Sequence, residues 1–344
     1  MLHQRGGIST QRAQIEVVPE ACDRVARVVA SLPLPADREE TSLPELPRAV
    51  VGNFFLALVA ICHQTSPRRR PPLEGTVGNV RRRGWDFLLA RFEALAAEDL
   101  QLLTPARWAV LTENDVRSFF YDPELGDRLT DPAGRADLLR DLGITMMSRG
   151  WSTAAQVYEY CDGRIAAGHP NLLEALSSFE AYQDPVRKKS YYFLALMRNS
   201  GVWRYSDDEA LGPPVDYHEV RGHLRLGTVR VVDPLLLEKI RAGREVTADE
   251  DVAIRQAVLD AIVRISERSG VRNVIRLHYF FWNLFRGVCT RDLPQCLGIK
   301  LASLPARYES LLLATSGGCP FASLCPNAGL HHPVCEHEVQ TEYY

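Results

Sequence analysis

Two lysines and one aspartate have the residue types and the spacing for chemistry at a sugar carbon. Lys188 and Lys189 precede an apolar segment, and Asp216 follows Pro-Pro-Val, 27 residues after Lys189. A neutral lysine amine can attack an anomeric carbon and form a Schiff base. A carboxylate can stabilise the positive charge that develops on the sugar as the bond to a leaving base breaks. The three residues therefore predict cleavage of an N-glycosidic bond, if two helices bring the amine and the carboxylate to one cleft.

Each of these residues also has a plain structural interpretation. A lysine pair at the start of a helix is usually solvated, and an aspartate before a helix is usually its N-cap. For Asp216 the cap is compatible with catalysis. A helix does not direct two successive side chains into one cleft, so Lys188 is the alternative to Lys189 as the inward-facing amine.

The cysteines form a second chemical group. The chain has eight cysteines, and five of them lie in the last 56 residues. This clustering favours a metal site, because disulfides are rare in the reducing cytosol. The candidate ligands are Cys289, Cys296, Cys319 and Cys325. Four thiolates suit an iron-sulfur cluster and equally suit Zn²⁺. Cys335, with His331, His332 and His337, leaves a further zinc ligand set open.

Two arginine triplets, 68–70 and Arg81, Arg82 and Arg83, flank a segment rich in proline and glycine. The interpretation without function is a solvated loop. The functional interpretation is an edge that contacts phosphates, because guanidinium groups bind phosphate oxygens in pairs.

The elements that must position these groups are helices. Apolar residues recur at three- and four-residue spacing, and the segments 49–62 and 274–288 are apolar nearly all round. Strand patterns are sparse, at a start near Ile15 and at 229–232. Thr247 and Glu250 form a capping box for a helix that Gly270 ends. The predicted fold class is therefore all-α.

Composition limits the partners of the chain. The 344 residues can bury a full core, and the net charge of -3 gives no overall basic field, so a nucleic-acid site must be a local patch. No charged start is followed by an apolar run, and no stretch is long enough to span a bilayer. We expect a cytoplasmic protein that binds no membrane.

The lysine and aspartate segments resemble the helix-hairpin-helix DNA glycosylases, of which endonuclease III is the familiar member. Arg187-Lys188-Lys189-Ser190 is similar to the family's hairpin exit, and Val215-Asp216-Tyr217-His218-Glu219-Val220-Arg221 to its aspartate segment. This resemblance implies Lys189 as the Schiff-base lysine and Asp216 as the catalytic carboxylate. It departs from the family at the hairpin, where glycines that approach a DNA phosphate are missing.

The cysteines resemble the four-iron cluster loop of the same family. Six residues separate Cys289 from Cys296 and five separate Cys319 from Cys325, whereas the middle gap is 22 residues instead of the family's two. The resemblance implies a 4Fe-4S cluster, with zinc as the alternative. It also implies a helical glycosylase fold of three parts: an arm at 1–47, a core at 48–284 and a cluster segment at 285–344.

Archaeal 8-oxoguanine DNA glycosylases resemble the chain further at Lys189-Ser190-Tyr191-Tyr192-Phe193 and Pro214-Val215-Asp216-Tyr217. This implies a monomeric base-excision repair enzyme with AP-lyase activity, acting on duplex DNA whose damaged purine is flipped out. The residues expected to contact the base are Trp282, Phe193, His278 and His218. The residues expected to contact the DNA backbone are Arg81, Arg82, Arg83, Arg187 and Lys188. In the archaeal enzymes a carboxylate stands where this chain has His278, which weakens the case for 8-oxoguanine itself.

Two other functions remain open on the same residues. Queuosine salvage hydrolases resemble the chain in an aspartate before tyrosine, and imply cleavage of a deazaguanine nucleotide instead of DNA. A metal-stabilised DNA-binding module without chemistry is the second alternative. The lysines and Asp216 at the family's spacing argue against it.

Overall fold

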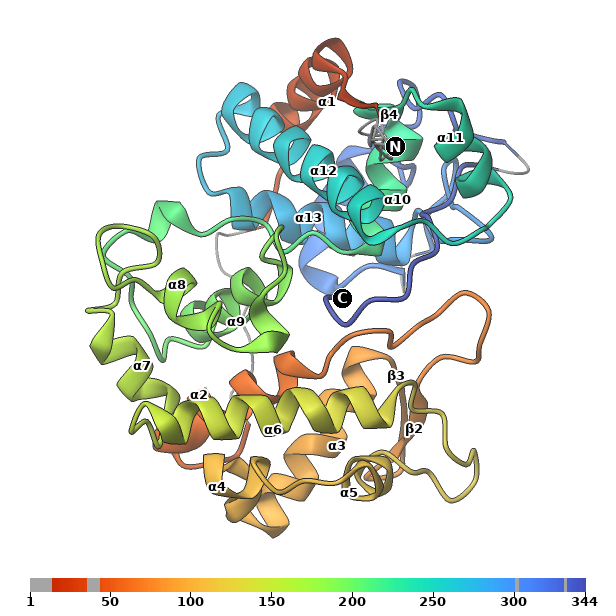
Figure 1. Ribbon diagram of the computed structural model, residues 1–344. Coiled ribbons are helices and arrows are strands. Elements are labelled where there is room, and N and C mark those ends of the chain that lie inside the picture. The colour runs from red at the N-terminus through yellow and green to blue at the C-terminus, as the bar shows by residue number, and fades with distance from the viewer. Residues whose placement is uncertain (1–13, 36–43, 301–302, 331–332) are drawn as a thin grey trace, which may run out of the picture.

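The computed structural model describes residues 14–35, 44–300, 303–330 and 333–344. Their regular structure is mostly helical, which confirms the all-α class (Figure 1). The helices are α1 (Pro19–Ser31), α2 (Arg48–Ala60), α3 (Trp85–Glu98), α4 (Pro105–Trp108), α5 (Glu113–Phe119), α6 (Pro132–Ser148), α7 (Ala154–Tyr160), α8 (Leu172–Leu176), α9 (Lys188–Asn199), α10 (Tyr217–Leu226), α11 (Pro234–Arg241), α12 (Ala248–Ser269), α13 (Val274–Gly287) and α14 (Glu309–Ala314).

Two short strand pairs accompany the helices. β1 (Ile15–Val17) pairs antiparallel with β4 (Val229–Val231), and both strands were predicted from their apolar alternation. β2 (Glu74–Val77) and β3 (Val80–Arg83) form a hairpin in the segment that the sequence predicts as a loop. Gly78 and Asn79 join them with positive φ angles of 57° and 64°. Such a two-residue turn matches the twist of paired strands, so the loop prediction was wrong for these residues.

The apolar residues gather in two cores, which we call lobe 1 and lobe 2. Lobe 1 contains the buried apolar side chains of α2 to α9. Lobe 2 contains those of α1, β4 and α10 to α13, with parts of the segment 288–321. Figure 1 shows the two groups of helices one above the other, with the C-terminal residues between them. The chain therefore starts in lobe 2, builds lobe 1 and returns.

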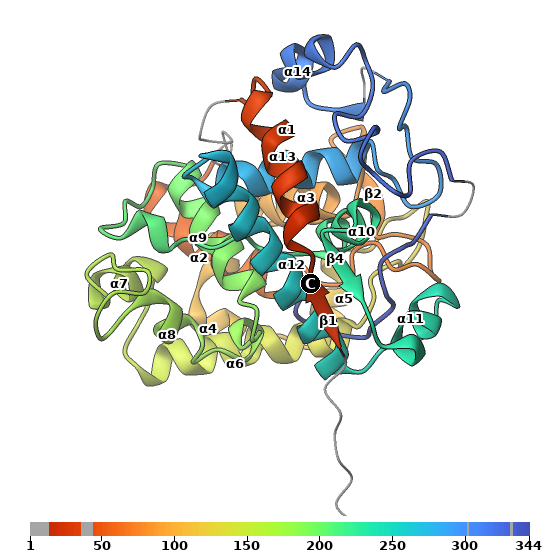
Figure 2. The same cartoon turned by 90° about the horizontal axis from the view of Figure 1, so that it is seen from above.

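This arrangement divides the chain differently from the ranges 1–47, 48–284 and 285–344. α1 was expected in an arm, yet it lies along α12 and places Val25 and Val29 in the core of lobe 2 (Figure 2). α10 to α13 share that core with Leu304 and Phe321 of the cysteine-rich segment. Apolar burial, and not the change in composition at residue 285, sets the division.

The length and composition of the helices bear on whether any of them could cross a membrane. α12 is the longest helix described, and its first turn carries Asp249, Glu250 and Asp251. In the part of the chain that the structure describes, no helix combines the length and apolar character that crossing a bilayer requires.

Candidate active site

Asp216 is the N-cap of α10, as predicted. Its Oδ1 accepts hydrogen bonds from the backbone N–H groups of His218 (2.8 Å) and Glu219 (3.4 Å). Its Oδ2 accepts one from the indole Nε1 of Trp282 on α13, at 2.9 Å. The chain crosses from lobe 1 to lobe 2 immediately before it, at residues 212–215. The carboxylate therefore lies where the lobes meet, held by the start of one helix and the face of another.

The start of α9 is formed by a tight turn around Asp184. The carboxylate of Asp184 accepts hydrogen bonds from the backbone N–H groups of Val186 (3.1 Å) and Lys188 (2.9 Å). Arg187 precedes the helix in the left-handed region, with φ 60° and ψ 28°. That conformation costs a non-glycine residue about 1–2 kcal/mol, and glycine adopts it freely. The turn thus keeps a left-handed residue although the sequence lacks the expected glycine.

The two lysines of α9 have different surroundings. Lys189 is fully buried, and its Nζ donates to the carbonyl oxygen of Ala60 at 2.5 Å. Burial lowers the pKa of Lys189 to about 7, so a large share of this amine is neutral near pH 7. Lys188 is 8% exposed, with its Nζ 3.4 Å from the Cys62 sulfur and 5.1 Å above the ring of Tyr192. Burial therefore shifts the pKa of Lys189, whereas Lys188 keeps a small solvent-exposed surface.

His278 is a buried imidazole on which charges from both lobes act. Burial lowers the pKa of His278 to about 3, while the negative charge of Asp216 raises it and the positive charge of Lys188 lowers it further. Both charges therefore lie within electrostatic range of one imidazole. The pKa of Lys189, lowered mainly by burial, responds to Cys62, Lys188, Arg135 and Glu342. Of the two lysines, Lys188 is therefore the one whose charge acts on His278.

One face of α13 supports the first turn of α10. His278 and Trp282 lie one helical turn apart on α13, and Trp282 binds Asp216. His278 Nδ1 lies 2.8 Å from Glu219 Oε1, and Glu219 is completely buried. Burial raises the pKa of Glu219 well above its ordinary value, and the charge of Asp216 raises it further. Glu219 was not predicted as a site residue, although its place three residues after Asp216 on the predicted helix is a signal that could have identified it.

The other residues expected to contact a base lie apart from one another. His218 is half-buried beside Trp282 (ring centroids 6.1 Å apart), with its Nδ1 2.7 Å from an Arg221 nitrogen. Phe193 is buried in lobe 1, where its ring meets Tyr182 and Trp203 edge to face. His218 therefore lies next to Asp216, and Phe193 takes the place of a core aromatic residue.

Three of the arginines expected to contact phosphates lie on strand β3, and the fourth, Arg187, lies before α9. Arg81 and Arg83 are exposed and Arg82 is half-buried. Arg81 pairs with Glu74 across the hairpin at 2.6 Å, and Arg83 donates to Ser66 at 3.3 Å. The Arg187 side chain is exposed at the turn before α9. Arg81 is partly neutralised within the protein, so the patch is less basic than the sequence suggests.

A buried network of charges joins the lobes behind this site. Arg255 on α12 makes two hydrogen bonds with Asp184, at 2.8 and 2.9 Å, and also binds Asp251. His337 and the hydroxyl of Tyr344 contact the other oxygen of Asp251, at 2.7 and 2.6 Å. The guanidinium carbon of Arg255 lies 4.8 Å from the centre of the Tyr344 ring. The carboxylate that forms the turn before Lys188 is therefore held by lobe 2.

The candidate metal ligands come together around the end of α10. Burial raises the pKa of the Cys319 thiol to about 12, and negative charge on Cys289, Cys296 and Cys325 raises it further. The four sulfurs therefore lie within electrostatic range of one another. Arg225 on α10 donates to the Cys289 sulfur at 3.3 Å, and its carbonyl oxygen lies 3.2 Å from the Cys325 sulfur.

A thiolate-bound group fits this donor set. Four thiolates bound to such a group would carry negative charge. The Arg225 guanidinium, 3.3 Å from the Cys289 sulfur, and the backbone N–H groups of Phe321 and Asn327 at the Cys319 and Cys325 sulfurs would offset it. Within residues 14–35, 44–300, 303–330 and 333–344, no three His, Cys, Asp or Glu side chains are placed to hold a metal ion as they stand. A bound group would therefore draw the sulfurs closer. Cys335 lies on the other side of Arg225, 3.7 Å from it, and His331 and His332 lie outside the described residues.

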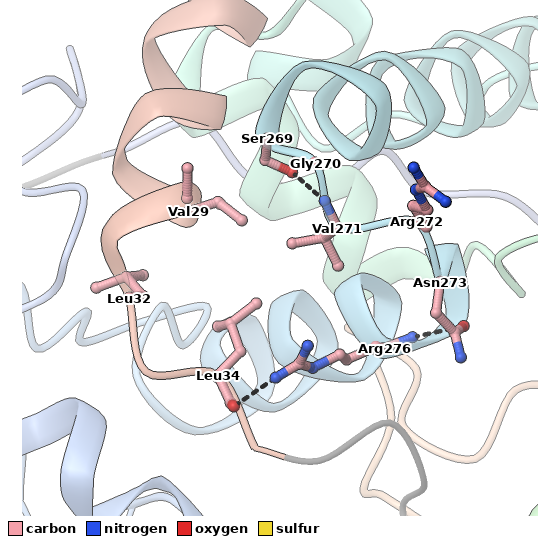
Figure 3. A pocket seen from close by; sticks show the side chains of 10 residues that line it. Val29, Leu32, Leu34, Ser269, Gly270, Val271, Arg272, Asn273 and Arg276 are labelled. Atoms are coloured by element: carbon pink, nitrogen blue, oxygen red, sulfur yellow. Dashed lines mark hydrogen bonds between the residues drawn. The ribbon is translucent and has the colours of Figure 1, made fainter.

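Two cavities lie outside the first turn of α10. The larger, of about 480 Å³, lies between α1 and the turn joining α12 to α13 (Figure 3). Arg276 spans it and donates to the carbonyl oxygens of Leu34 and Pro35, at 2.6 Å each. The smaller, of about 40 Å³, lies beside Tyr217, between residues 64–68 and the C-terminal residues. It is much smaller, but its lining includes Tyr217, the residue that follows Asp216 in the chain.

The sequence comparisons add no relative to this description. No protein-family model matches the chain, and no curated protein matches its sequence significantly.

Proposed function

We propose that this protein is a DNA N-glycosylase of the helix-hairpin-helix type, with AP-lyase activity, that removes a damaged or modified purine in base excision repair. One observation carries the proposal. The first residue of α9 and the N-cap of α10 come from different lobes, and their charges act on the same buried imidazole, His278. An amine and a carboxylate at one lobe junction are the two groups that this chemistry needs.

The roles follow from the surroundings of each group. Asp216 is held by three N–H donors, so its charge is fixed where a sugar cation would form. Trp282 directs the N–H edge of its indole to Asp216, and the Arg286 guanidinium carbon lies over one face of the ring, 4.8 Å from its centre. A base turned out of a duplex could stack in this region. We propose that the cysteines bind a 4Fe-4S cluster, or zinc, which organises the end of α10.

The covalent step has two candidate amines. The resemblance points to Lys189, whose lowered pKa favours the neutral amine. Lys189 is enclosed, however, and Lys188 is the lysine whose charge reaches His278. We therefore assign the Schiff base to Lys188 and a supporting role to Lys189, the next residue of α9, which is fully buried.

Borohydride trapping on duplex oligonucleotides with single base lesions tests the proposal. Wild type should form a covalent adduct with at least one lesion, and Lys188→Gln should abolish trapping. Lys189→Gln should retain measurable trapping. The reverse result would return the Schiff base to Lys189. Asp216→Asn should reduce base release by about 100-fold or more, because an amide cannot offset the charge on the sugar. If all three variants match wild type on every lesion, the site lies elsewhere.

A second candidate is hydrolysis of a free deazaguanine nucleotide. The observation that favours it is the closure of the junction: the backbone N–H of Gln64 in lobe 1 donates to the Tyr344 carbonyl, and the Tyr344 hydroxyl binds Asp251 in lobe 2. The cavity lined by Tyr217 has a volume of about 40 Å³, whereas a duplex needs an open groove. Release of base from the nucleotide, without release from any duplex and without trapping, would establish this alternative.

A further inference from the structure

The first turn of α10 carries two carboxyl groups in contrasting environments. Asp216 accepts hydrogen bonds from three N–H groups and is partly exposed. Glu219 is completely buried. In the described structure the only hydrogen-bond partner of its carboxyl group is His278 Nδ1, 2.8 Å from Oε1. Two carboxyl groups with such different surroundings are the pattern by which a site separates a charged group from a proton donor.

The proton between Glu219 and His278 can be placed by burial and hydrogen bonding. The second oxygen of Glu219, Oε2, is buried without a hydrogen-bond partner in the described structure. An unpartnered oxygen costs far more on a carboxylate than on a neutral carboxylic acid. The nearby charge of Asp216 further opposes a second negative charge. Glu219 therefore donates its proton to Nδ1 of a neutral His278, and Nε2 carries the other ring proton.

The dyad lies beside the residues to which we assign the chemistry. His278 is next to Glu219, one turn from Trp282, and within the field of Asp216 and Lys188. No structural role accounts for a buried, incompletely bonded acid and imidazole at this position. A buried polar pair of this kind is costly, and a leucine and a phenylalanine would fill the same volume.

We propose that Glu219 and His278 form a proton relay that protonates the leaving base. This inference rests on the proposed function and adds to it the class of substrate: a base that departs as an anion unless it receives a proton. As the C1′–N bond breaks, its electron pair moves to the base. His278 Nε2 gives its proton to a nitrogen or oxygen of the base, and Glu219 gives its proton to Nδ1, so Glu219 ends as a carboxylate. The amine that bonds to C1′ releases one proton to solvent. After the base leaves, Nε2 takes a proton from solvent and Nδ1 returns its proton to Glu219, which restores the starting state.

Two lesions separate this role from a structural one. 8-Oxoguanine in duplex DNA needs a proton on leaving, whereas 7-methylguanine is already cationic and leaves without one. Glu219→Gln keeps a hydrogen bond to Nδ1 through its amide but has no proton to give. It should slow release of 8-oxoguanine by about 100-fold or more, in the range of general acid catalysis, and release of 7-methylguanine by less than about threefold. His278→Gln should show the same selectivity.

The pH profile provides a second readout. Release of 8-oxoguanine requires protonated Glu219, so its rate should fall as pH rises through the raised pKa of this group. The charged groups around the dyad are Asp216 and Lys188. The loss at high pH should vanish in Glu219→Gln. The matched control is His223→Gln on the same helix, because His223 is also fully buried, contacts Thr228 at 2.8 Å and has its pKa lowered to about 3 by burial. That variant should keep the wild-type profile and lesion selectivity.

The dyad can also be tested without activity. In a protein labelled with ¹⁵N-histidine, His278 should show a neutral ring protonated on Nε2 from about pH 5 to 8. Protonation on Nδ1, with a carboxylate as its acceptor, would overturn the relay, as would equal loss on both lesions in Glu219→Gln. If wild type and Asp216→Asn release neither base, the proposed function fails, and the histidine spectrum still reports whether the dyad is built as inferred.

Discussion

The two lobes are stabilised by different kinds of burial. Lobe 1 is formed by helices whose buried side chains are mostly apolar, with α2 buried along most of its length. Lobe 2 has an apolar core as well, but it also buries a set of charged and titratable side chains: Glu219, Arg221, His223, Arg225, Asp251, Arg255, Glu336 and His337. Lobe 1 is held mainly by apolar packing, and lobe 2 depends in addition on hydrogen bonds and ion pairs between buried polar groups.

The reason for the difference is the C-terminal segment. Within the described residues beyond α13, α14 is the main regular element, so many backbone groups there need partners outside helices and strands. Arginines of α10 supply them: Arg225 donates to the carbonyls of Cys289, Thr290, Arg291 and Val334. A few buried guanidinium groups can thus order a segment that has little regular structure. The order of that segment then depends on each of these groups.

Replacement of a cysteine ligand should give the largest difference between the two lobes in their response to a substitution. Cys289→Ser should remove the bound group and the visible absorption of an iron-sulfur protein, and should destabilise lobe 2 by several kcal/mol, since ligand binding contributes to folding. Hydrogen exchange should rise in 222–228 and 288–330 while α6 stays protected. Cys335→Ser is the matched control and should keep both colour and protection. If wild-type protein purified without oxygen is colourless and contains one equivalent of zinc, the bound group is zinc and not an iron-sulfur cluster.

The buried arginine that joins the lobes should give the next largest effect. Arg255→Met leaves Asp184 and Asp251 buried without their partner, which should cost about 3–5 kcal/mol in the free energy of unfolding. Arg230→Met breaks an exposed pair with Glu16 and should change stability by less than about 1 kcal/mol. Chemical denaturation of both variants measures the contrast. Similar losses in the two variants would show that pairing within lobe 2 is not the basis of its stability.

The sequence predicted those parts of the fold that depend on local pattern. The α2 and α13 helices, the capping box of Thr247 and Glu250, and the N-cap role of Asp216 follow from side chains close together in the chain. The hairpin at 74–83 was missed because the arginine triplet suggested solvated loop, although Gly78-Asn79 is a typical two-residue turn.

The candidate site was predicted in composition but not in geometry. Asp216 and Trp282 do meet, at 2.9 Å. The choice between Lys188 and Lys189 depends on how α9 is rotated against α2, and no spacing encodes that rotation. The pairs Arg255–Asp184 and Glu219–His278 join residues 71 and 59 positions apart, so only the folded chain shows them.

Two glycines test whether side chains are packed equally tightly in the two lobes. A Cβ on Gly222 of α10 would lie 2.2 Å from the Phe285 ring of α13, whereas one on Gly52 of α2 would lie 3.0 Å from the Ala154 Cβ. Gly222→Ala should therefore destabilise the protein by about 1–3 kcal/mol. In Gly52→Ala the gain in helix propensity, about 1 kcal/mol, should offset a slight displacement. Thermal unfolding would compare them, and a neutral Gly222→Ala would show that α13 can shift away from α10.

The hairpin arginines of lobe 1 should give the smallest effect, because part of their charge is already paired. If Arg81, Arg82 and Arg83 contact DNA phosphates, replacing all three with alanine flattens the slope of log affinity against log salt by about 0.9 per lost contact. Arg81 is bound to Glu74 and Arg83 to Ser66, so we expect the loss of about one contact and not three. Between 50 and 200 mM salt, a slope lower by this amount means that the loss of affinity is about threefold smaller than in wild type. Glu74→Gln is the informative partner variant: it frees Arg81 and should steepen the slope by about the same amount. An unchanged slope in both variants would assign the hairpin to the solvated surface and leave DNA binding to other parts of the lobe junction.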